Sequence, residues 1–321
     1  MRAPDFWHRD DRLARATAAL LAPLGWAYGA SVRWKAARAK PFRARVPVVC
    51  IGNISAGGTG KTPIAIAIAD AIIARGKNPF FLTRGYGGKL AGPVVVGKDH
   101  TADDVGDEPL LLARKAATVV ARDRRDGARL AVQRGADVIV MDDGHQNFSL
   151  HKDLTLIVVD AERGFGNGRV LPAGPLREPA DQGLARADAL ILAGDGKPAC
   201  PAFNGPVLRA HVAPAHSGDW KGTRVVAFAG IGRPEKLFRS LAGLGAELVE
   251  TVAFADHHPY NHAELAALKR RAGDVRLVTT EKDYVRIPEA DRDGLSFLPV
   301  TAAIEPHTAL DRLLDRLLAS R

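Results

Sequence analysis

A chain of 321 residues exceeds the usual size of a single hydrophobic core, so two domains are expected. Hydrophobic residues make up 46% of the chain and charged residues 25%, which excludes a disordered chain and a multi-span membrane protein. The two cysteines, Cys50 and Cys200, exclude a disulfide framework and a cysteine metal site, and they fit a reducing cytoplasm.

The amino-terminal arm, residues 1–45, carries most of the formal charge of +9. It holds ten Lys and Arg against three Asp, a net charge of +7, so that the rest of the chain carries only +2. A basic excess confined to one arm attracts an anionic surface and differs from the broad basic face of a nucleic-acid-binding protein. We therefore expect an anionic surface, and no nucleic acid, as its partner.

The same arm contains an apolar stretch at residues 16–33, interrupted by Pro23, Gly25 and Gly29. It is too short and too broken for a confident membrane-spanning helix. A secretory signal is rejected because the chain runs directly on into a nucleotide-binding motif. The pattern favours an interfacial helix on an anionic membrane, and the alternative is a helix packed on its own domain.

From Val46 onward, short apolar runs alternate with helical patterns. Strands are predicted at 46–51, 79–83, 137–141, 154–160 and 188–193, and helices at 62–75, 109–115 and 124–134. Hydrophobicity that is continuous rather than alternating indicates strands covered on both faces, hence a mainly parallel sheet in an α/β fold. We expect a P-loop NTPase-type domain over residues 46–218.

A second unit is predicted from a new strand and turn near Gly222, after a stretch rich in Pro, Gly and His at 198–218. Further strands are expected at 275–280 and 296–300, and helices at 234–244, 262–271 and 307–319. The sequence therefore predicts a smaller carboxyl-terminal α/β domain over residues 219–321, with a cleft between the two domains.

The strongest chemical signal is the segment GNISAGGTGKT at residues 52–62, between a predicted strand and a predicted helix. Small residues let backbone N–H groups surround phosphate oxygens, while the Lys reaches the β- and γ-phosphates and the Thr hydroxyl binds Mg²⁺. Ser55 departs from the strict pattern, and an ordinary glycine turn is the alternative, but GKT follows at the right offset. The predicted nucleotide-binding residues are Ser55, Ala56, Gly57, Gly58, Thr59, Gly60, Lys61 and Thr62.

Two adjacent acids, Asp142 and Asp143, follow the predicted strand at 137–141. P-loop proteins keep a Mg²⁺-associated carboxylate at the carboxyl end of such a strand, beside the phosphate loop. The alternative is a pair of solvated loop acids.

With these residues in place, the chain resembles the tetraacyldisaccharide 4′-kinase family, the lipid A kinases of Gram-negative bacteria, over nearly its full length. Two positions depart from the family pattern: His145 within the DDGxQ element, and Asn147 just after it. The resemblance rests on an ordered set of motifs: VPVVCIGNISAGGTGKTP (46–63), TRGYGG (83–88), GDEP (106–109), DDGHQ (142–146), FGNGRVLPAGPLRE (165–178), GIGRPEKLF (230–238), FADHHPY (254–260) and TTEKD (279–283).

The resemblance implies transfer of the γ-phosphoryl group of ATP, with Mg²⁺, to the 4′-hydroxyl of a tetraacylated glucosamine disaccharide 1-phosphate in lipid A (lipopolysaccharide) biosynthesis. It implies a peripheral protein at the cytoplasmic face of the inner membrane, with two P-loop-like α/β domains, the catalytic one first, and the acylated lipid substrate between them. Separately from the resemblance, we expect a monomer.

For the chemistry, the resemblance implies Asp107 as the base, partnered with His257 of the second domain, because a His that shares the proton makes a weak Asp base more useful. The alternatives are a helix-start Asp and a structural His. Mg²⁺ would be held by Thr62 with help from Glu108, Asp142 or Asp143, all hard oxygen ligands.

Arginines with a planar donor fork suit phosphoryl oxygens. Arg124 and Arg177 look like the family's phosphate-facing arginines, with Arg122 or Arg125 as substitutes for Arg124. Arg84 and Tyr86 are expected at the lipid headgroup. The roles of Lys282 and Asp283 stay open.

Two other classes of protein share a phosphate loop. A P-loop GTPase/ATPase switch or metal chaperone that reads guanine would need an N-K-x-D element, and the nearest segment, TEKD at 280–283, is not one. A membrane scaffold with a vestigial nucleotide site is disfavoured because the candidate base, metal ligands and Lys are all present.

Overall fold

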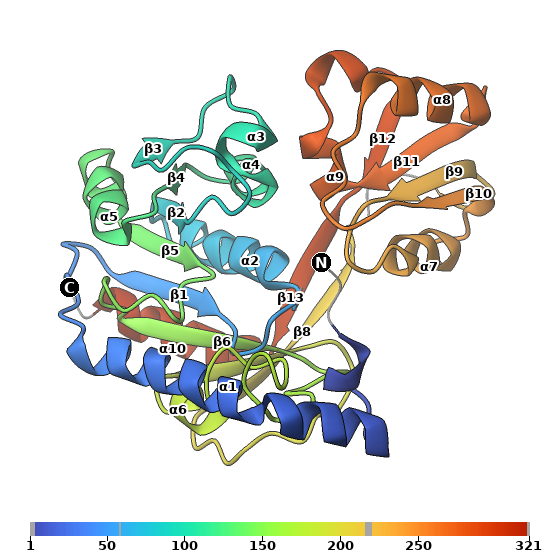
Figure 1. Ribbon diagram of the computed structural model, residues 1–321. Helices are drawn as coiled ribbons and strands as arrows, with labels where there is room; N and C mark the ends of the chain where they lie inside the picture. Colours follow the sequence, from blue (N-terminus) through green and yellow to red (C-terminus); the bar gives the residue numbers. More distant parts are fainter. Residues whose placement is uncertain (1–3, 58, 216–219, 320–321) are drawn as a thin grey trace.

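The computed structural model describes residues 4–57, 59–215 and 220–319, which form two α/β lobes (Figure 1). The larger lobe is built on a nine-stranded sheet of order β13-β8-β7-β6-β1-β5-β2-β4-β3. Pairing is parallel except for β3 with β4 and β13 with β8. Its strands are β1 (Val48–Gly52), β2 (Pro79–Thr83), β3 (Val94–Val95), β4 (Thr118–Val120), β5 (Val138–Asp142), β6 (Leu154–Asp160), β7 (Ala189–Ala193), β8 (Val207–Pro214) and β13 (Val300–Glu305).

The five strands predicted in this lobe are confirmed, and β2 and β6 have the predicted bounds. Their continuous apolar runs divide alternate side chains between two cores. In β5, Val138 and Val140 enter one core, whereas Ile139 and Met141 enter the core on the opposite face. A strand buried on both faces is what a parallel sheet between helices requires.

Helices cover both faces of this sheet. The first core packs against α2 (Lys61–Ile73) and α10 (His307–Ala319), and the second packs against α5 (Arg124–Gln133). The remaining helices of the lobe are short: η1 (Asp5–Trp7), α3 (Ala102–Val105), α4 (Asp107–Ala113) and α6 (Ala180–Leu184).

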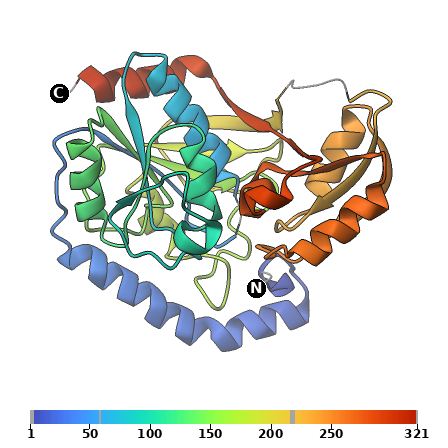
Figure 2. The ribbon, with the colours of Figure 1, turned by 90° about the horizontal axis from the view of Figure 1, so that it is seen from above.

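The smaller lobe has a four-stranded parallel sheet of order β10-β9-β11-β12. Figures 1 and 2 show it as a separate body beside the larger lobe. Its elements are β9 (Arg224–Ala229), α7 (Glu235–Gly243), β10 (Glu247–Ala253), α8 (His262–Ala272), β11 (Arg276–Thr280), α9 (Glu281–Arg286), η2 (Glu289–Asp291) and β12 (Leu295–Leu298).

The expected carboxyl-terminal domain of residues 219–321 needs correction. Strand β13 pairs antiparallel with β8 at the edge of the large sheet, and Leu310, Leu314 and Leu317 of α10 lie in the core of the large lobe. The chain thus enters the small lobe after β8 and returns through β13. The stretch 198–218, rich in Pro, Gly and His, contains a full strand of the large sheet, β8.

The amino-terminal arm contains one continuous helix, α1 (Arg12–Arg38), despite Pro23. It lies along the outside of the large lobe (Figures 1 and 2). Its packed face is made of small residues, and a Cβ at Gly25 would lie 2.8 Å from the Val170 carbonyl oxygen. The other face is exposed. One face of the helix packs on its own domain, as one alternative expects, while contact of the other face with a membrane stays a prediction.

Candidate active site

The phosphate loop joins the end of β1 to the start of α2. Gly60 caps the helix with a left-handed backbone (φ +78°), a conformation that glycine adopts without strain. The Ala56 N–H donates to the Pro175 carbonyl at 2.7 Å, and Arg177 N–H donates to the Ile54 carbonyl at 2.7 Å. The loop is therefore tied to the segment that carries Arg177.

The predicted nucleotide-binding residues all lie on this loop or on the first turn of α2, except that Gly58 lies outside the described residues. Buried Asn53, which the sequence reasoning did not assign, fastens the loop from within: its Nδ2 donates to the Ser55 carbonyl at 2.6 Å and to Thr59 Oγ1 at 3.4 Å. Its place directly after the strand, in the GN pair, was the available signal.

Asp143 lies between two cations. Its Oδ1 is 3.6 Å from Lys61 Nζ and 2.8 Å from Arg177 Nη1. Burial would raise the pKa of Asp143, but the positive charges of Lys61 and Arg177 outweigh burial and hold it below its usual value. The backbone of Asp143 is left-handed (φ +49°), a strained conformation typical of functional sites.

Asp142 has the opposite environment. Its side chain is 1% exposed, and its Oδ1 has no hydrogen-bond partner among the described residues. Burial, followed by the negative charge of Glu108, raises the pKa of Asp142 to about 7. A buried carboxylate oxygen without a partner is an appropriate ligand for a hard cation.

These groups fit Mg²⁺, although no cluster of three or more His, Cys, Asp or Glu side chains suited to a metal occurs in the described part of the chain. Mg²⁺ takes few protein ligands and completes its shell with waters and substrate phosphate oxygens. Thr62 and Asp142 could hold it together with Glu108, whose Oε1 also lies 3.3 Å from Lys282 Nζ, whereas Asp143 is paired with two cations, Lys61 and Arg177.

Asp107 and His257 lie together, as the sequence predicts. Asp107 opens α4 in the large lobe, His257 follows β10 in the small lobe, and His257 Nδ1 is 3.0 Å from Asp107 Oδ2. His257 has a left-handed backbone (φ +58°), and its N–H donates to the Gly230 carbonyl at 3.0 Å. Glu108, next to Asp107, is close enough to Asp142 to raise its pKa, so the dyad borders the candidate Mg²⁺ site.

Asp107 is 5% exposed but ionised. Burial would raise its pKa, yet the hydrogen bond from His257 and the charges of Lys282 and Arg286 together hold the pKa of Asp107 well below the usual range. Because its pKa is low, the Asp107 carboxylate is unprotonated and can accept a proton, but it binds that proton only weakly. An adjacent imidazole compensates because it can share the proton.

The three neighbouring arginines considered for phosphate binding, Arg122, Arg124 and Arg125, differ in burial and in partners. Arg124 is 3% exposed, and burial, then the nearby charge of Arg84, lowers its pKa to about 10, while Asp142 and Asp143 act in the opposite direction. Arg125 instead pairs with Asp123 on the surface at 2.6 Å, and Arg122 Nη2 contacts the Lys89 carbonyl at 3.4 Å. Of the three arginines, Arg124 is thus the buried one and the one whose pKa responds to the acidic pair.

Tyr86 is 75% exposed, and its ring lies edge-on to the His257 ring with centroids 6.4 Å apart. Arg84, two residues earlier, is also exposed. Both follow β2 at the same edge of the sheet as Asp142, and both are therefore accessible beside the dyad.

Three further polar residues support the site and were missed. Gln146 donates to Glu178 Oε1 at 2.9 Å and to the Asn53 carbonyl at 3.0 Å. Arg286 donates to Asp107, as described below. Gln146 and Glu178 fall inside quoted motifs, which was a signal for them, whereas Arg286 lies just beyond TTEKD.

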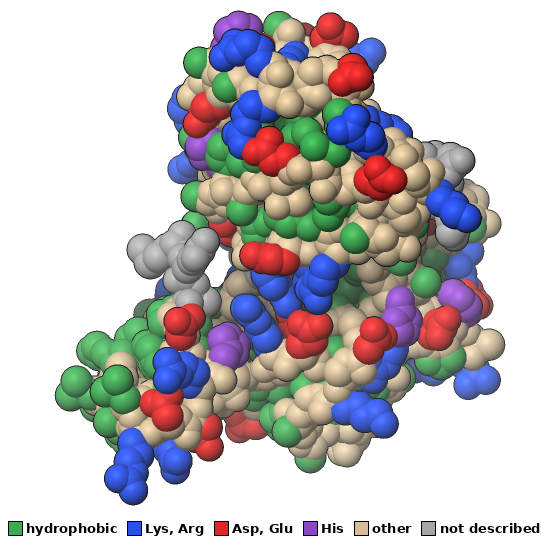
Figure 3. Space-filling model, turned by 90° about the vertical axis from the view of Figure 1, so that its right-hand side faces the viewer, with side chains coloured by type: hydrophobic (Ala, Val, Ile, Leu, Met, Phe, Trp, Pro, Cys, Tyr) green, Lys and Arg blue, Asp and Glu red, His purple; other side chains and the backbone are tan. Residues whose placement is uncertain are grey.

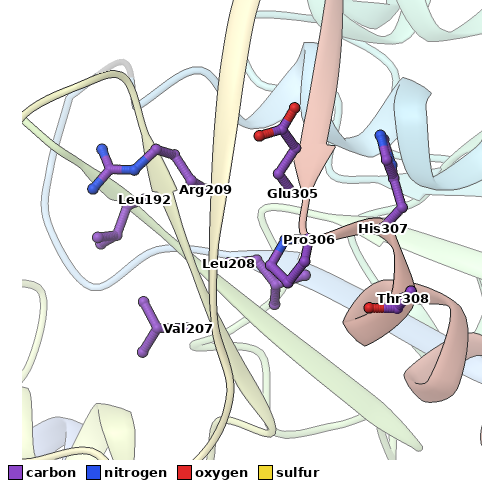
Figure 4. Close-up of a pocket in the computed structure, with 8 residues that line it drawn as sticks. All are labelled: Leu192, Val207, Leu208, Arg209, Glu305, Pro306, His307 and Thr308. Atoms are coloured by element: carbon purple, nitrogen blue, oxygen red, sulfur yellow. The ribbon is translucent and has the colours of Figure 1, made fainter.

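The pocket drawn in Figure 4, about 630 Å³ in volume, lies between the end of β7, the start of β8, the end of β13 and the start of α10. None of its lining residues belongs to the candidate site. Arg209 at its wall is engaged with the Gly196 carbonyl at 3.0 Å.

Comparisons with known proteins match this chain over most of its length. The family described as Tetraacyldisaccharide-1-P 4′-kinase matches residues 17–319. Proteins named tetraacyldisaccharide 4′-kinase from Paramagnetospirillum magneticum and Rhodospirillum centenum are 51% and 49% identical, covering 99% and 100% of this chain and 99% and 98% of their own. A crystal structure of LpxK from Aquifex aeolicus in complex with ATP superposes with a TM-score of 0.80 at 26% identity, covering 94% of this chain and 99% of that one.

Proposed function

Because the chain belongs to the tetraacyldisaccharide-1-P 4′-kinase family, we propose that its reaction takes place where the phosphate loop meets Asp107 and His257. The family match and the relatives confirm the resemblance that the sequence motifs indicate. The chain is an ATP- and Mg²⁺-dependent phosphotransferase with an alcohol acceptor. In lipid A biosynthesis it transfers the γ-phosphoryl group to the 4′-hydroxyl of a tetraacylated disaccharide 1-phosphate.

The observation that carries the placement is the contact between Asp107 of the large lobe and His257 of the small lobe, at 3.0 Å. Glu108 and Asp142 stand next to this contact, and Lys61 acts on Asp142 from the phosphate loop. A base, a metal-ligand set and a phosphate-binding Lys thus converge on one region, as phosphoryl transfer requires.

ATP would bind with its phosphates against the backbone N–H groups of the loop and against Lys61, which a phosphate could draw away from Asp143. Thr62, Asp142 and Glu108 would hold Mg²⁺, which neutralises charge on the phosphates. Arg124 and Arg177 would contribute further positive charge to the phosphoryl oxygens.

In the transfer step, the 4′-oxygen attacks the γ-phosphorus. The new O–P bond forms as the bond to the β–γ bridging oxygen breaks, and ADP leaves with that oxygen. Asp107 accepts the hydroxyl proton, and His257 Nδ1 shares it through the 3.0 Å contact. Arg84 and Tyr86, exposed beside the dyad, would contact the sugar headgroup.

We propose that α1 places this site at the cytoplasmic face of the inner membrane. Leu13, Leu20 and Leu24 are 78%, 80% and 59% exposed and recur at helical spacing on one face. Figure 3 shows hydrophobic and basic side chains together at its lower left, where α1 begins. Exposed leucines flanked by Arg and Lys fit an interfacial helix on anionic lipid.

No helix within the described residues is long and apolar enough to cross a membrane. One chain supplies every residue assigned to the site, so we infer that it acts as a monomer. The molar mass measured by light scattering in detergent tests whether the chain is a monomer.

The function is tested by transfer of radiolabel from γ-labelled ATP to a purified tetraacyldisaccharide 1-phosphate in detergent. Labelled lipid from the native chain, and none from Lys61→Ala or Asp107→Ala, is the expected result. Nucleotide hydrolysis without labelled lipid would instead favour a switch protein, and no nucleotide turnover a scaffold.

A further inference from the structure

Arg286 lies buried at the contact between the two lobes. It ends α9 in the small lobe, which packs against α4 of the large lobe (Figure 1). Its side chain is 6% exposed, and both Nε and Nη2 lie 2.8 Å from Asp107 Oδ2. Nε donates a hydrogen bond to the oxygen that also contacts His257, whereas Nη2 is near the same oxygen as an ion-pair contact without a hydrogen bond.

The other side of the guanidinium is fixed within the small lobe. Arg286 Nη1 donates to Asp283 Oδ1 at 2.8 Å. Asp283 is fully buried and accepts further hydrogen bonds from Tyr260 Oη at 3.1 Å, Thr280 Oγ1 at 2.6 Å and the Gly230 N–H at 3.1 Å. A buried carboxylate with this many donors holds Arg286 in one orientation. Asp283, to which the sequence assigned no role, therefore orients Arg286.

The Gly230 carbonyl links Arg286 to His257. It accepts from Arg286 Nη1 at 2.9 Å and from the His257 backbone N–H at 3.0 Å. Two of the small-lobe groups that contact Asp107 Oδ2 are thus positioned relative to the same atom. The third, Lys282 Nζ, lies 3.7 Å from that oxygen. A shift of the small lobe moves them together with respect to Asp107.

We propose that Arg286 is a positioning residue for the phosphoryl transfer. By binding Asp107 Oδ2 from the small lobe, it orients the Asp107 carboxylate between the acceptor hydroxyl and His257 when the two lobes are in contact. This inference rests on the proposed function. It requires the planar fork of arginine, because Nε donates to Asp107 while Nη1 donates to Asp283 and Gly230, and a single ammonium nitrogen cannot occupy both positions.

The test compares Arg286→Lys, Arg286→Ala and the matched control Arg292→Ala in the full chain. Arg292 is also tied to the small lobe, through Nε to the Ile287 carbonyl at 2.8 Å, and no contact joins it to Asp107 among the described residues. Kinetics of lipid labelling are measured with each variant, with and without added guanidinium at tens of millimolar, below denaturing levels.

We expect Arg286→Ala to lower kcat by about 10- to 100-fold with KM for ATP changed by less than about 3-fold, since only the orientation of the base is lost. Added guanidinium should restore part of kcat in this variant alone. Arg286→Lys should fold and keep a kcat reduced by about 5-fold or more, because it retains the charge without the fork. Arg292→Ala should keep the native kcat.

A kcat within about 2-fold of native for Arg286→Ala overturns the inference. If Arg286→Ala does not fold, Arg286→Lys decides: native kcat in the lysine variant would make the arginine merely structural. Failure of the proposed function has a different signature, namely no labelled lipid from the native chain, and would overturn both.

Discussion

His257 Nδ1 lies 3.0 Å from Asp107 Oδ2, although the two side chains belong to different lobes. Asp107 is held at the start of α4, and His257 has a left-handed backbone on the loop after β10. Neither lobe contains the pair by itself. The arrangement of the two lobes therefore determines whether a base with a proton-sharing partner exists.

Replacing either member of this pair should remove general-base catalysis. Asp107→Asn keeps the shape of the side chain but cannot accept the proton, so kcat should fall by about 10²- to 10⁴-fold, and His257→Gln by about 10- to 100-fold. If the two act as a unit, the double variant should be hardly slower than Asp107→Asn. Initial rates of lipid labelling measure all three.

The adjacent histidine is the matched control. His258 stacks on Phe254 at 4.6 Å and contacts Glu264 at 3.2 Å instead of Asp107. His258→Gln should keep kcat within about 3-fold of native while lowering stability slightly. Multiplicative losses in the double variant would mean that Asp107 and His257 act independently.

Lys61→Met should strongly slow transfer without unfolding the chain. The ammonium group would be lost from the phosphates, which costs about 10²- to 10³-fold in kcat. Asp143 remains paired with Arg177 at 2.8 Å, so the loop should keep its fold. Calorimetric titration with ATP should show weaker binding. Lys77→Met, an exposed residue beyond the far end of α2, should bind ATP as the native chain does.

Asp142 should make the ligand-free protein less stable as the pH rises. Its pKa is about 7 in the folded chain against 3.8 for the free side chain, so the folded state holds the proton more tightly. The resulting stabilisation is complete below about pH 4 and is lost as the pH rises through about 7. Asp142→Asn cannot ionise, so its advantage over the native chain in free energy of unfolding should grow by about 1–4 kcal/mol between pH 5 and pH 8.

Denaturant unfolding at several pH values without Mg²⁺ measures this difference. Exposed Asp99→Asn is the control and should keep the pH dependence of the native chain. A constant difference between Asp142→Asn and the native chain across the pH range would show that Asp142 ionises normally in the fold.

Local pattern was sufficient to predict the elements that place the phosphate loop. The strands at 79–83 and 154–160 are continuous apolar runs, and the loop residues follow from the chemistry of phosphate binding. The neighbourhood of Asp107 and His257 could not be derived from composition or spacing. It came from the family resemblance, because contacts across lobes depend on tertiary structure.

Other features were not readable from the sequence. Arg286 has no motif of its own, and its partners Asp107 and Gly230 lie far away in the chain. The return of the chain to the large sheet was missed because the strand expected at 296–300 covers most of β12 and only the first residue of β13, and the helix expected at 307–319 was assigned to the small lobe. Hydrophobic pattern specifies that a strand exists, and not which sheet it joins.

The return of the chain to the large lobe gives a stability prediction. Leu314 of α10 is fully buried in the same core as the α2 side chains. Leu314→Ala should lower the free energy of unfolding of the large lobe by about 2–5 kcal/mol, through lost burial and a cavity. Tryptophan fluorescence cannot assign this loss to one lobe, so hydrogen exchange of the α2 amides is the measurement.

The solvent-exposed Leu20→Ala is the control, with an expected change below about 0.5 kcal/mol. Unchanged protection in α2, with faster exchange confined to β9 and β11 of the small lobe, would contradict the assignment of α10 to the large lobe.

The exposed face of α1 should govern binding to lipid vesicles. Deleting residues 1–40 should release the chain from membranes, but it also removes buried Trp7, whose Nε1 donates to the Pro172 carbonyl at 3.1 Å. The triple change Leu13→Ser, Leu20→Ser and Leu24→Ser leaves the packed face intact. It should reduce sedimentation with anionic vesicles by about 10- to 100-fold in partition coefficient, because three leucines no longer enter the acyl boundary.

Val249→Ser is the control for exposed apolar surface, since Val249 is 48% exposed on β10, far from the arm in sequence. It should sediment as the native chain does. Raising the salt concentration should weaken native binding as well, because the Arg and Lys of the arm act on charged headgroups within a Debye length. If the triple variant sediments with vesicles at low salt as the native chain does, the three leucines of α1 do not bind the membrane, and the proposal for α1 is wrong.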